Sequence, residues 1–328
     1  MRSSRWIAVV ASASLLTVGV AACGSDDDDS GSGGGGDLSG TIRIDGSSTV
    51  APLSEPVAEL FMEENPDVRV TVGTSGTGGG FEKFCNGETD ISDASRPIET
   101  DEEQACRQNG IETSQLTVAN DALSVVVNPE NPVTCMTVDQ LVQVWGPNSE
   151  VDSWSQIDGL QPAYDAELTL FGPGTDSGTF DYFTEAINGE EGVQRSNYNN
   201  VGEDDNQTVT GVSGAPGGMG YFGFSFLQEN EGKIKALEID GGDGCVAPSA
   251  ATVQNGTYVP LGRGLFIYPS AEALQRPEAQ EFLQFYLDNV NDVAEQAGFI
   301  SLTDAQMSKA QSQLDALLGE GGGEETTG

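Results

Sequence analysis

Gly172-Pro-Gly-Thr-Asp-Ser-Gly-Thr-Phe-Asp-Tyr-Phe183 is the stretch that decides how this chain folds, because small polar residues stand in it where a strand gives way to a helix. The strand is predicted over Leu168–Phe171, and apolar residues at helical spacing follow until Asn188-Gly189 supplies a stop signal. The first N–H groups of a helix lack intrahelical partners and carry partial positive charge, so this helix start is predicted to hold a small anion. Its candidate residues are Ser177, Gly178 and Thr179. A helix cap without a ligand is the alternative.

The same stretch contains Asp-Ser-Gly-Thr at residues 176–179, a tetrapeptide that aspartic proteases carry at their catalytic carboxylates. A monomeric protease of that kind needs two copies, whereas this sequence holds one, preceded by Pro, Gly and Thr instead of an apolar strand. The chain also has no histidine, which excludes Ser-His-Asp catalysis and histidine-based metal sites. We therefore expect no enzyme activity, no catalytic residues, no metal and no cofactor.

Two earlier stretches repeat the arrangement of strand, small polar residues and helix. Asp45-Gly-Ser-Ser-Thr-Val50 follows alternating isoleucines, and the glycine-rich run Gly73–Gly80 follows alternating valines. The second run is neither a P-loop nor a dinucleotide fingerprint, and a flexible linker is the alternative to ligand contact. Because glycines allow close backbone approach, we favour ligand contact. The candidates in these two stretches are Ser48, Thr49, Ser75 and Thr77.

Arg96 is a candidate cation for the same anion, within the segment Thr89–Ile98. A planar guanidinium suits bidentate contact with a tetrahedral oxyanion. A surface salt bridge is the alternative role for this side chain.

The net charge of −39 makes nucleic acid and anionic membrane surfaces poor partners. The same charge repels an anionic ligand. Any anion site must therefore depend on donors at short range, where screening by salt does not remove their effect.

The N-terminus has the pattern of an exported lipoprotein. Arg2 and Arg5 precede an apolar run that ends at Ala22, and the residues up to Cys23 resemble a lipobox, so residues 1–22 are predicted to be a signal peptide. Cys23 would then carry lipid and anchor the protein to the outer face of the cell membrane; an uncleaved membrane span is the alternative. The composition of residues 23–38 predicts a flexible linker, and that of residues 319–328 a disordered tail.

Setting Cys23 aside, an even number of cysteines remains, as expected for disulfides in an exported chain: Cys85, Cys106, Cys135 and Cys245. Three pairings are possible. We favour Cys85 with Cys106, which closes a local loop, and Cys135 with Cys245, which ties distant parts of one domain. A zinc site is the alternative, although no close Cys-x-x-Cys spacing is present.

Alternating strands and helices predict an α/β fold in two lobes. Residues 122–127 are expected to carry the chain into a second lobe, and residues 258–268 to carry it back. The predicted first lobe therefore comprises residues 39–121 plus 260–318, and the second lobe residues 122–259.

The motifs of residues 45–50, 73–81, 91–98 and 172–183, in this order, resemble those of the phosphate-binding proteins of bacterial ABC phosphate importers. The similarity spans roughly residues 40–302. It implies a type II periplasmic-binding-protein fold, with a ligand cleft between two lobes and two hinge crossings. It also implies a monomeric receptor that captures inorganic phosphate and delivers it to permease subunits. Sulfate or molybdate binding on the same fold, a phosphate-binding sensor or adhesin, and an acidic hydrolase are the alternatives.

Carried over by motif, the implied phosphate contacts are Ser48, Thr49, Ser75, Thr77, Arg96, Ser177, Gly178 and Thr179. Pro173 and Gly174 stand where an arginine can occur in the family, so Arg96 is expected to supply that charge from the other lobe.

Discrimination between phosphate and sulfate must use the proton that phosphate retains near neutral pH. A carboxylate accepts a hydrogen bond from that proton but repels fully ionised sulfate. The candidate acceptors are Asp93, Asp176 and Asp205, and the sequence does not choose among them.

Overall fold

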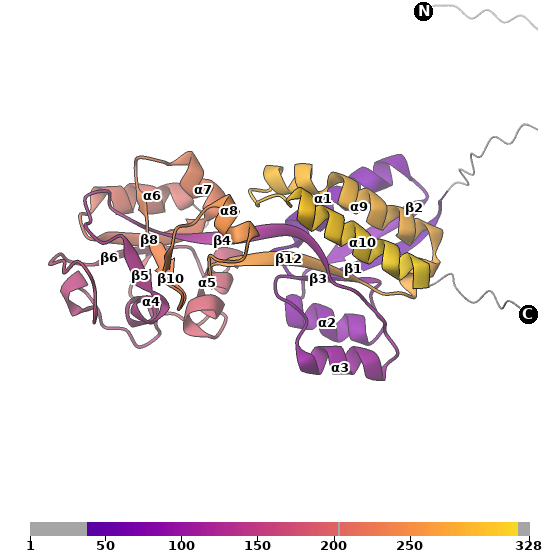
Figure 1. Ribbon diagram of the computed structural model, residues 1–328, viewed down its shortest axis with the longest axis horizontal. Coiled ribbons are helices and arrows are strands. Elements are labelled where there is room, and N and C mark those ends of the chain that lie inside the picture. Colours follow the sequence, from indigo (N-terminus) through magenta and orange to yellow (C-terminus); the bar gives the residue numbers. More distant parts are fainter. Residues whose placement is uncertain (1–37, 203, 321–328) are drawn as a thin grey trace, which may run out of the picture. The chain divides into compact units, whose positions relative to one another are not determined.

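The computed structural model describes residues 38–202 and 204–320 (Figure 1). All of the described residues belong to one compact unit. The predicted signal peptide, Cys23 and the predicted linker up to residue 37 lie outside the described residues. Over the described ranges, no helix has both the length and the apolar character that a membrane span requires.

One large sheet runs through the unit. Its strands lie in the order β2 (Val68–Gly73), β1 (Gly40–Gly46), β3 (Ile91–Ala94), β12 (Gly262–Pro269), β4 (Leu116–Val127), β8 (Gly218–Gly223), β6 (Thr169–Gly172) and β7 (Asn199–Asn200), and β9 (Lys235–Ala236) also pairs with β4. The strands β1, β2 and β3 are mutually parallel, whereas β12 is antiparallel to both β3 and β4. A small second sheet contains β11 (Cys245–Val246), β10 (Glu238–Asp240) and β5 (Cys135–Thr137).

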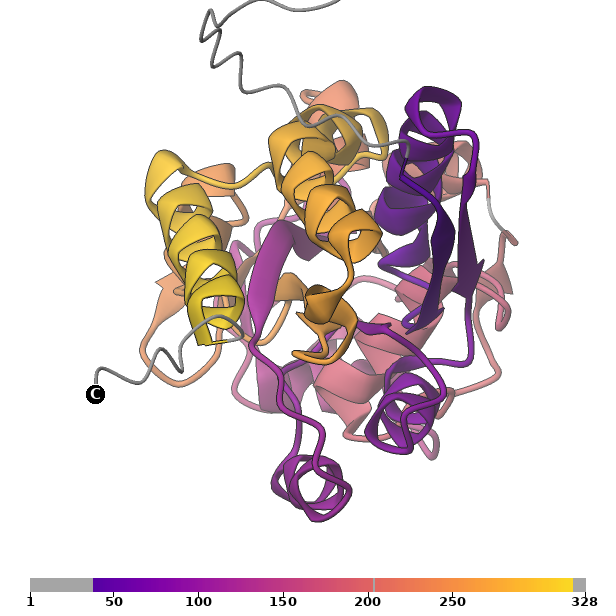
Figure 2. The same cartoon turned by 90° about the vertical axis from the view of Figure 1, so that its right-hand side faces the viewer.

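The first lobe is built on β1, β2 and β3. On one face of these strands lie α1 (Ala51–Glu64), α9 (Pro277–Gln296) and α10 (Asp304–Glu320), and on the other lie α2 (Thr77–Cys85) and α3 (Thr100–Gln108), as Figures 1 and 2 show. The alternation in β1 buries Ile42 and Ile44, which pack in one apolar core with Phe61 of α1 and Phe282 of α9.

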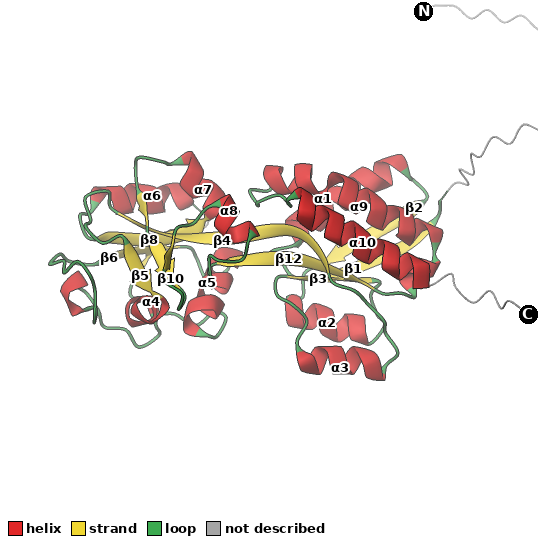
Figure 3. Ribbon diagram, in the orientation of Figure 1, coloured by secondary structure: helices red, strands yellow, loops and turns green. Residues whose placement is uncertain are grey.

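The second lobe places helices around β6 and β8 in the same layered way (Figure 3). They are α4 (Val138–Trp145), α5 (Gly178–Asn188), α6 (Asp205–Gly214), α7 (Phe224–Glu229) and α8 (Ala250–Gln254). Trp145, Phe183 and Tyr221 pack in its core, the last two as stacked rings 3.7 Å apart. The helix α5 ends as predicted at Asn188, because Gly189 adopts the left-handed conformation that closes a helix.

The strands β4 and β12 lie between the two cores. Along β4, Ala119 packs in the first core and Ala122 in the second. On the return path Leu261 belongs to the second core and Leu265 to the first. The pairing of β12 with β4 shifts register between Leu265 and Phe266, immediately after this changeover.

Both favoured disulfides are confirmed. Cys85–Cys106 joins α2 to α3, and Cys135–Cys245 joins β5 to β11. All four of these cysteines are therefore in disulfides, and none of them has a free thiolate with which to bind zinc. This excludes the alternative of a four-cysteine zinc site among the described residues.

The C-terminal region differs from the sequence prediction in its last helix. The helix α10 was not predicted, although Ala310, Leu314 and Leu317 recur at helical spacing and are buried in the first core. It continues through Glu320, so residues 319 and 320, which were predicted to belong to the disordered tail, are helical. Residues 321–328 lie outside the described part of the chain.

Candidate anion-binding site

Three loops of the first lobe meet where β1, β2 and β3 end, because the carboxyl ends of parallel strands share one edge of a sheet. Gly76 donates its N–H to the Gly46 carbonyl at 2.9 Å, which ties the second loop to the first. The Thr77 and Ser95 hydroxyls lie 3.1 Å apart, and the Ser95 N–H donates to Thr77 Oγ1 at 3.2 Å. The three loops therefore form one connected wall of hydroxyl and backbone groups.

Glycine is required at two places in this wall. Gly76, which precedes α2, has a φ of +81°, a conformation that other residues rarely adopt. A Cβ on Gly80 would lie 2.5 Å from the Gly46 Cα, so the absence of a side chain lets α2 pack directly on the end of β1. The glycine-rich run thus brings a helix start close to the first loop.

A cavity of about 40 Å³ lies between this wall and the start of α5. Its lining residues are Ser47, Ser48, Thr49, Gly76, Thr77, Ser95, Gly178, Asp181, Tyr182, Glu185, Glu191 and Arg263. A Cβ on Gly178 would lie 3.8 Å from Thr49 Oγ1, so the two lobes approach closely here. The volume is far below the roughly 300–1,000 Å³ of pockets for drug-sized molecules. The cavity therefore suits a small ligand with several hydrogen-bond acceptors.

Four of the sequence-predicted contacts line this cavity: Ser48, Thr49, Thr77 and Gly178. Ser177 is buried at the N-cap of α5 and donates its N–H to the Gly174 carbonyl, while Thr179 occupies the first turn. Ser75 is exposed, and its N–H and hydroxyl both donate to Asp45 Oδ1, at 3.1 and 2.5 Å. These last three side chains do not line the cavity in this structure.

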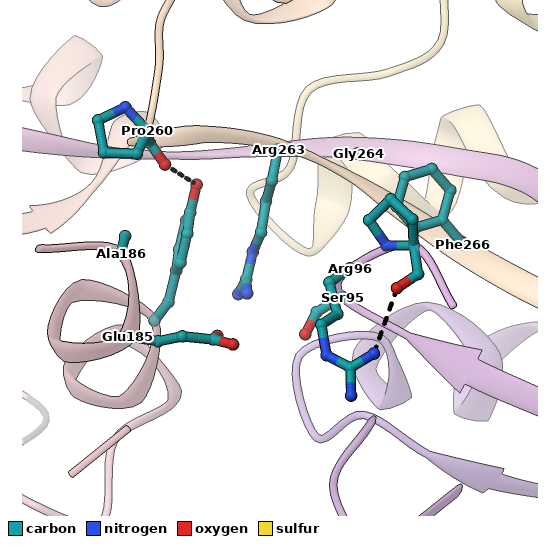
Figure 4. Close-up of a pocket in the computed structure, with 10 residues that line it drawn as sticks. Ser95, Arg96, Glu185, Ala186, Pro260, Arg263, Gly264 and Phe266 are labelled. Carbon is teal, nitrogen blue, oxygen red and sulfur yellow. Dashed lines mark hydrogen bonds between the residues drawn. The ribbon is translucent and has the colours of Figure 1, made fainter. Parts of the chain in front are cut away.

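Arg96 is in the salt bridge that the sequence left as the alternative. Its two terminal nitrogens each donate to Glu102 at 2.8 Å, and its Nε lies 3.3 Å from Glu99. Glu102 is the main cause that raises the pKa of Arg96. The side chain lines a neighbouring pocket of about 340 Å³ instead of the small cavity (Figure 4).

None of the three predicted proton acceptors lines the cavity. Asp176 is exposed in the turn before α5, and Asp205 is the first residue of α6. Asp93 shares a face of β3 with Ile91, which packs in the first core, so the pleat of the strand turns Asp93 toward that core. Burial raises the pKa of Asp93 to about 7, the charges of Asp45 and Glu55 add to the rise, and the nearby Ser54 hydroxyl opposes it.

Carboxylates that sequence reasoning missed line the second-lobe side of the cavity: Asp181, Glu185 and Glu191. Burial raises the pKa of Asp181, and the charge of Glu185 adds to that rise. The pKa of Glu191 is raised by burial and then by the charges of Asp181 and Glu185. The sequence does carry a signal for the first two, since residues 178, 181 and 185 fall on one face of a helix.

Arg263 of β12 also lines the cavity and was not predicted from the sequence. It donates from Nη2 to Thr49 Oγ1 at 3.2 Å, and its Nε lies 3.3 Å from Asp121 of β4. Its guanidinium also lies 3.4 Å from the centre of the Tyr182 ring. Its only sequence signal is that it is the single cationic residue of the segment 258–268.

The geometry and the sequence together define a class of protein. Residues 31–290 match the family model described as the PBP superfamily domain, and the chain belongs to this family. The expected two-lobed fold of the periplasmic-binding-protein type, with two crossing strands and a cleft, is thereby confirmed.

Three similar proteins show which members of this family the chain resembles. The chain is 47% identical over 264 residues to protein SphX of Synechococcus elongatus, covering 80% of this chain and 77% of that protein. It is 35% identical over 284 residues to the phosphate-binding protein PstS of Staphylococcus saprophyticus, covering 86% of each. A crystal structure of a possible phosphate-binding protein from Planctomyces limnophilus matches with a TM-score of 0.80 and 43% identity, covering 86% of this chain and 99% of that one.

Proposed function

We propose that this protein is an extracytoplasmic receptor that binds inorganic phosphate in the small cavity and delivers it to an ABC permease for import. One observation carries the proposal. Hydroxyl- and glycine-rich loops that lie far apart in the sequence, and that precede helices of both lobes, border a single cavity of about 40 Å³. The name of the PstS relative, a phosphate-binding protein, supports the same ligand.

The hydroxyl groups and the positively polarised helix starts favour an oxyanion. The helices α1, α2 and α5 begin at or beside the cavity, and helix starts stabilise anions through unpaired N–H groups. Ser48, Thr49, Thr77 and Gly178 are in place to contact the ligand. Ser177 and Thr179 adjoin Gly178 and would come within reach as the lobes close, because neither lobe alone supplies all the contacts. The direct contacts predicted from the sequence for Ser75 and Arg96 are not part of this proposal, because in the structure these side chains donate to Asp45 and Glu102 and do not line the cavity.

The carboxylates of α5 suggest how phosphate is distinguished from sulfate. A phosphate ion that keeps a proton donates a hydrogen bond to a carboxylate, whereas sulfate near neutral pH has no such proton. We propose that Asp181, Glu185 or Glu191 accepts this bond in place of the acceptors expected from the sequence.

Isothermal titration calorimetry with phosphate, arsenate, sulfate and molybdate at pH 6 and pH 8 tests the binding proposal. We expect one phosphate per protein and much weaker binding of sulfate. Absence of phosphate binding would overturn the proposal, and preferential binding of sulfate or molybdate would support another oxyanion on this fold. Incubation with a phosphoester separates capture from hydrolysis, since a receptor releases no product.

The proposed site of action is the outer face of the cell membrane, through lipid on Cys23. Labelling with a radioactive fatty acid should mark the wild-type chain but not Cys23→Ala, which should be released into the medium. Deletion of the gene should reduce phosphate uptake. Normal uptake in the deletion strain would instead favour a sensor or adhesin that binds phosphate without serving transport.

A further inference from the structure

Arg263 stands where the two lobes meet. It comes from β12, one of the two strands between the cores, and its direct cross-strand neighbour is Asp121 of β4, the other. Through Nη2 it contacts Thr49 of the first lobe, and through the face of its guanidinium it stacks on Tyr182 of α5. One cationic side chain therefore contacts both walls of the proposed phosphate cavity and both crossing strands.

The one ion pair of Arg263 among the described residues is made through Nε, so its terminal nitrogens can still donate hydrogen bonds to an anionic ligand. Asp121 approaches the Nε edge at 3.3 Å, while Nη2 donates to the uncharged hydroxyl of Thr49. Arg96 differs, because both of its terminal nitrogens are bound by the Glu102 carboxylate. Figure 4 shows the side chain of Arg263, from the crossing strand β12, and that of Glu185, from α5, pointing into the same space. Of these two arginines, Arg263 alone lines the small cavity.

A cation is needed at this point for an electrostatic reason. The cavity is lined by Asp181, Glu185 and Glu191, in a protein whose formal charge is −39. A phosphate ion surrounded by hydroxyl groups and carboxylates alone would be repelled. Arg263 is held to 13% side-chain exposure between a carboxylate and an aromatic ring, so little conformational entropy remains to be lost when it binds an anion.

We propose that Arg263 is the cation that binds the oxyanion and that its contacts with both lobes couple ligand binding to closure of the cleft. This inference rests on the proposed function. The bound ion accepts hydrogen bonds from the terminal nitrogens of Arg263 while the hydroxyl groups of the first lobe and the start of α5 contact its other oxygens. The ligand thus completes a set of contacts that spans both lobes, and the closed arrangement gains free energy only when the ion is present.

Calorimetry on Arg263→Gln, Arg263→Lys and the matched control Arg96→Gln tests the assignment. We expect phosphate affinity to fall roughly 100-fold or more in Arg263→Gln, since removing one partner of a buried charged pair is costly. Arg263→Lys should retain part of the affinity because it keeps the charge but loses the planar donor pair. Arg96→Gln should lose less than about tenfold, as expected for a partly exposed salt bridge.

Small-angle scattering with saturating phosphate tests the coupling. Wild type and Arg96→Gln should become more compact on addition of phosphate, and Arg263→Gln should not. Thermal unfolding of the free proteins identifies a folding defect; if Arg263→Gln does not fold, Arg263→Lys provides both readouts and should bind more weakly than Arg96→Gln.

The two proposals fail in distinguishable ways. If wild type binds no phosphate, the proposed function is wrong. If wild type binds phosphate and Arg263→Gln binds it equally well, or if Arg96→Gln loses as much affinity or more, Arg263 is not the binding cation. If affinity falls in Arg263→Gln but compaction at saturation is normal, the coupling to closure is wrong.

Discussion

The two walls of the cavity differ in whether they expose carboxylates to it. The first-lobe wall presents hydroxyl and backbone groups, and its aspartates lie elsewhere: Asp45 is bound by Ser75 and Lys83, and Asp93 is buried in the strand behind. The second-lobe wall presents carboxylates of α5 and the loop after it directly to the cavity. The difference suggests a division of labour in which the first lobe supplies hydrogen-bond donors and the second selects the protonation state of the ligand.

The largest expected effect concerns the carboxylate that the first lobe buries. Asp93 is 0% exposed, and among the described residues neither of its carboxylate oxygens accepts a hydrogen bond of regular geometry, although the Ser54 hydroxyl lies near enough to oppose the rise in its pKa. Its folded-state pKa of about 7 lies above the ordinary 3.8, so the folded state binds the proton more tightly than the unfolded state. The resulting stabilisation is fully present below about pH 4 and is lost as the pH rises to about 7, by roughly 4 kcal/mol at most.

Replacing Asp93 by Asn should remove this pH dependence. Urea unfolding at pH 5 and pH 8 should show Asp93→Asn to be more stable than wild type at pH 8, with a smaller difference at pH 5. A variant that is less stable than wild type at pH 8 would show that the ionised Asp93 carboxylate has a stabilising partner. The contrast with the carboxylates that line the second-lobe wall would then be wrong.

The next effect concerns the donors of the first wall. Thr77→Val keeps the shape of the side chain but removes the hydroxyl that lines the cavity and pairs with Ser95. Since a hydrogen bond to a charged group contributes about 1.5–3 kcal/mol, phosphate affinity should fall roughly 10- to 100-fold by calorimetry. Ser75→Ala is the matched control, because that hydroxyl donates to Asp45 and the residue does not line the cavity, and it should change affinity much less. Equal losses in both variants would mean that the wall extends to Ser75.

A smaller effect of opposite sign is expected on the second wall. Glu191→Gln removes a negative charge from the cavity lining, so phosphate affinity should rise about two- to fivefold at pH 8, a modest gain because the residue is exposed. Glu190→Gln removes the same charge from the adjacent position, which does not line the cavity, and should have little effect. A loss of affinity in Glu191→Gln would instead identify Glu191 as the acceptor of the ligand proton.

The smallest effect is the pH dependence of that gain. The pKa values of Asp181 and Glu191 are both raised, so these groups take up protons at a higher pH than ordinary carboxyl groups. Their repulsion of the anion therefore declines as the pH falls through the raised values. The ratio of the Glu191→Gln affinity to the wild-type affinity should decrease as the pH is lowered from 8 to 5, and a ratio that stays constant contradicts this account. Phosphate itself changes protonation over this pH range, but this change affects both proteins equally and therefore cancels in the ratio.

The sequence predicted the features of this fold that depend on local signals. The strand-to-helix junction at residues 172–183 and the end of α5 follow from apolar spacing and the Asn-Gly stop signal. Ser48 and Thr77 could be brought to one site because the parallel strands β1 and β2 end at the same edge of the sheet. Gly178 lines the cavity from the second lobe, as the resemblance to two-lobed binding proteins implied.

The features that depend on pairing between distant segments were missed. Arg263 reaches Thr49 across 214 residues, and nothing local places β12 between β3 and β4. Asp93 could not be assigned to a face because every residue of β3 is buried, which removes the alternation that normally identifies the inward side. The helix α10 depends on packing against the first core, since acidic and polar residues dominate its sequence.

The register shift between β12 and β4 has a mechanical consequence. Irregularities of this kind bend a strand and increase its local twist, and this one lies beside the point where the two cores exchange. Because two hydrogen-bonded strands join the lobes, we expect any opening and closing to hinge at this bend and to be restricted to one axis. A motion restricted in this way would cost little conformational entropy when the closed form is reached.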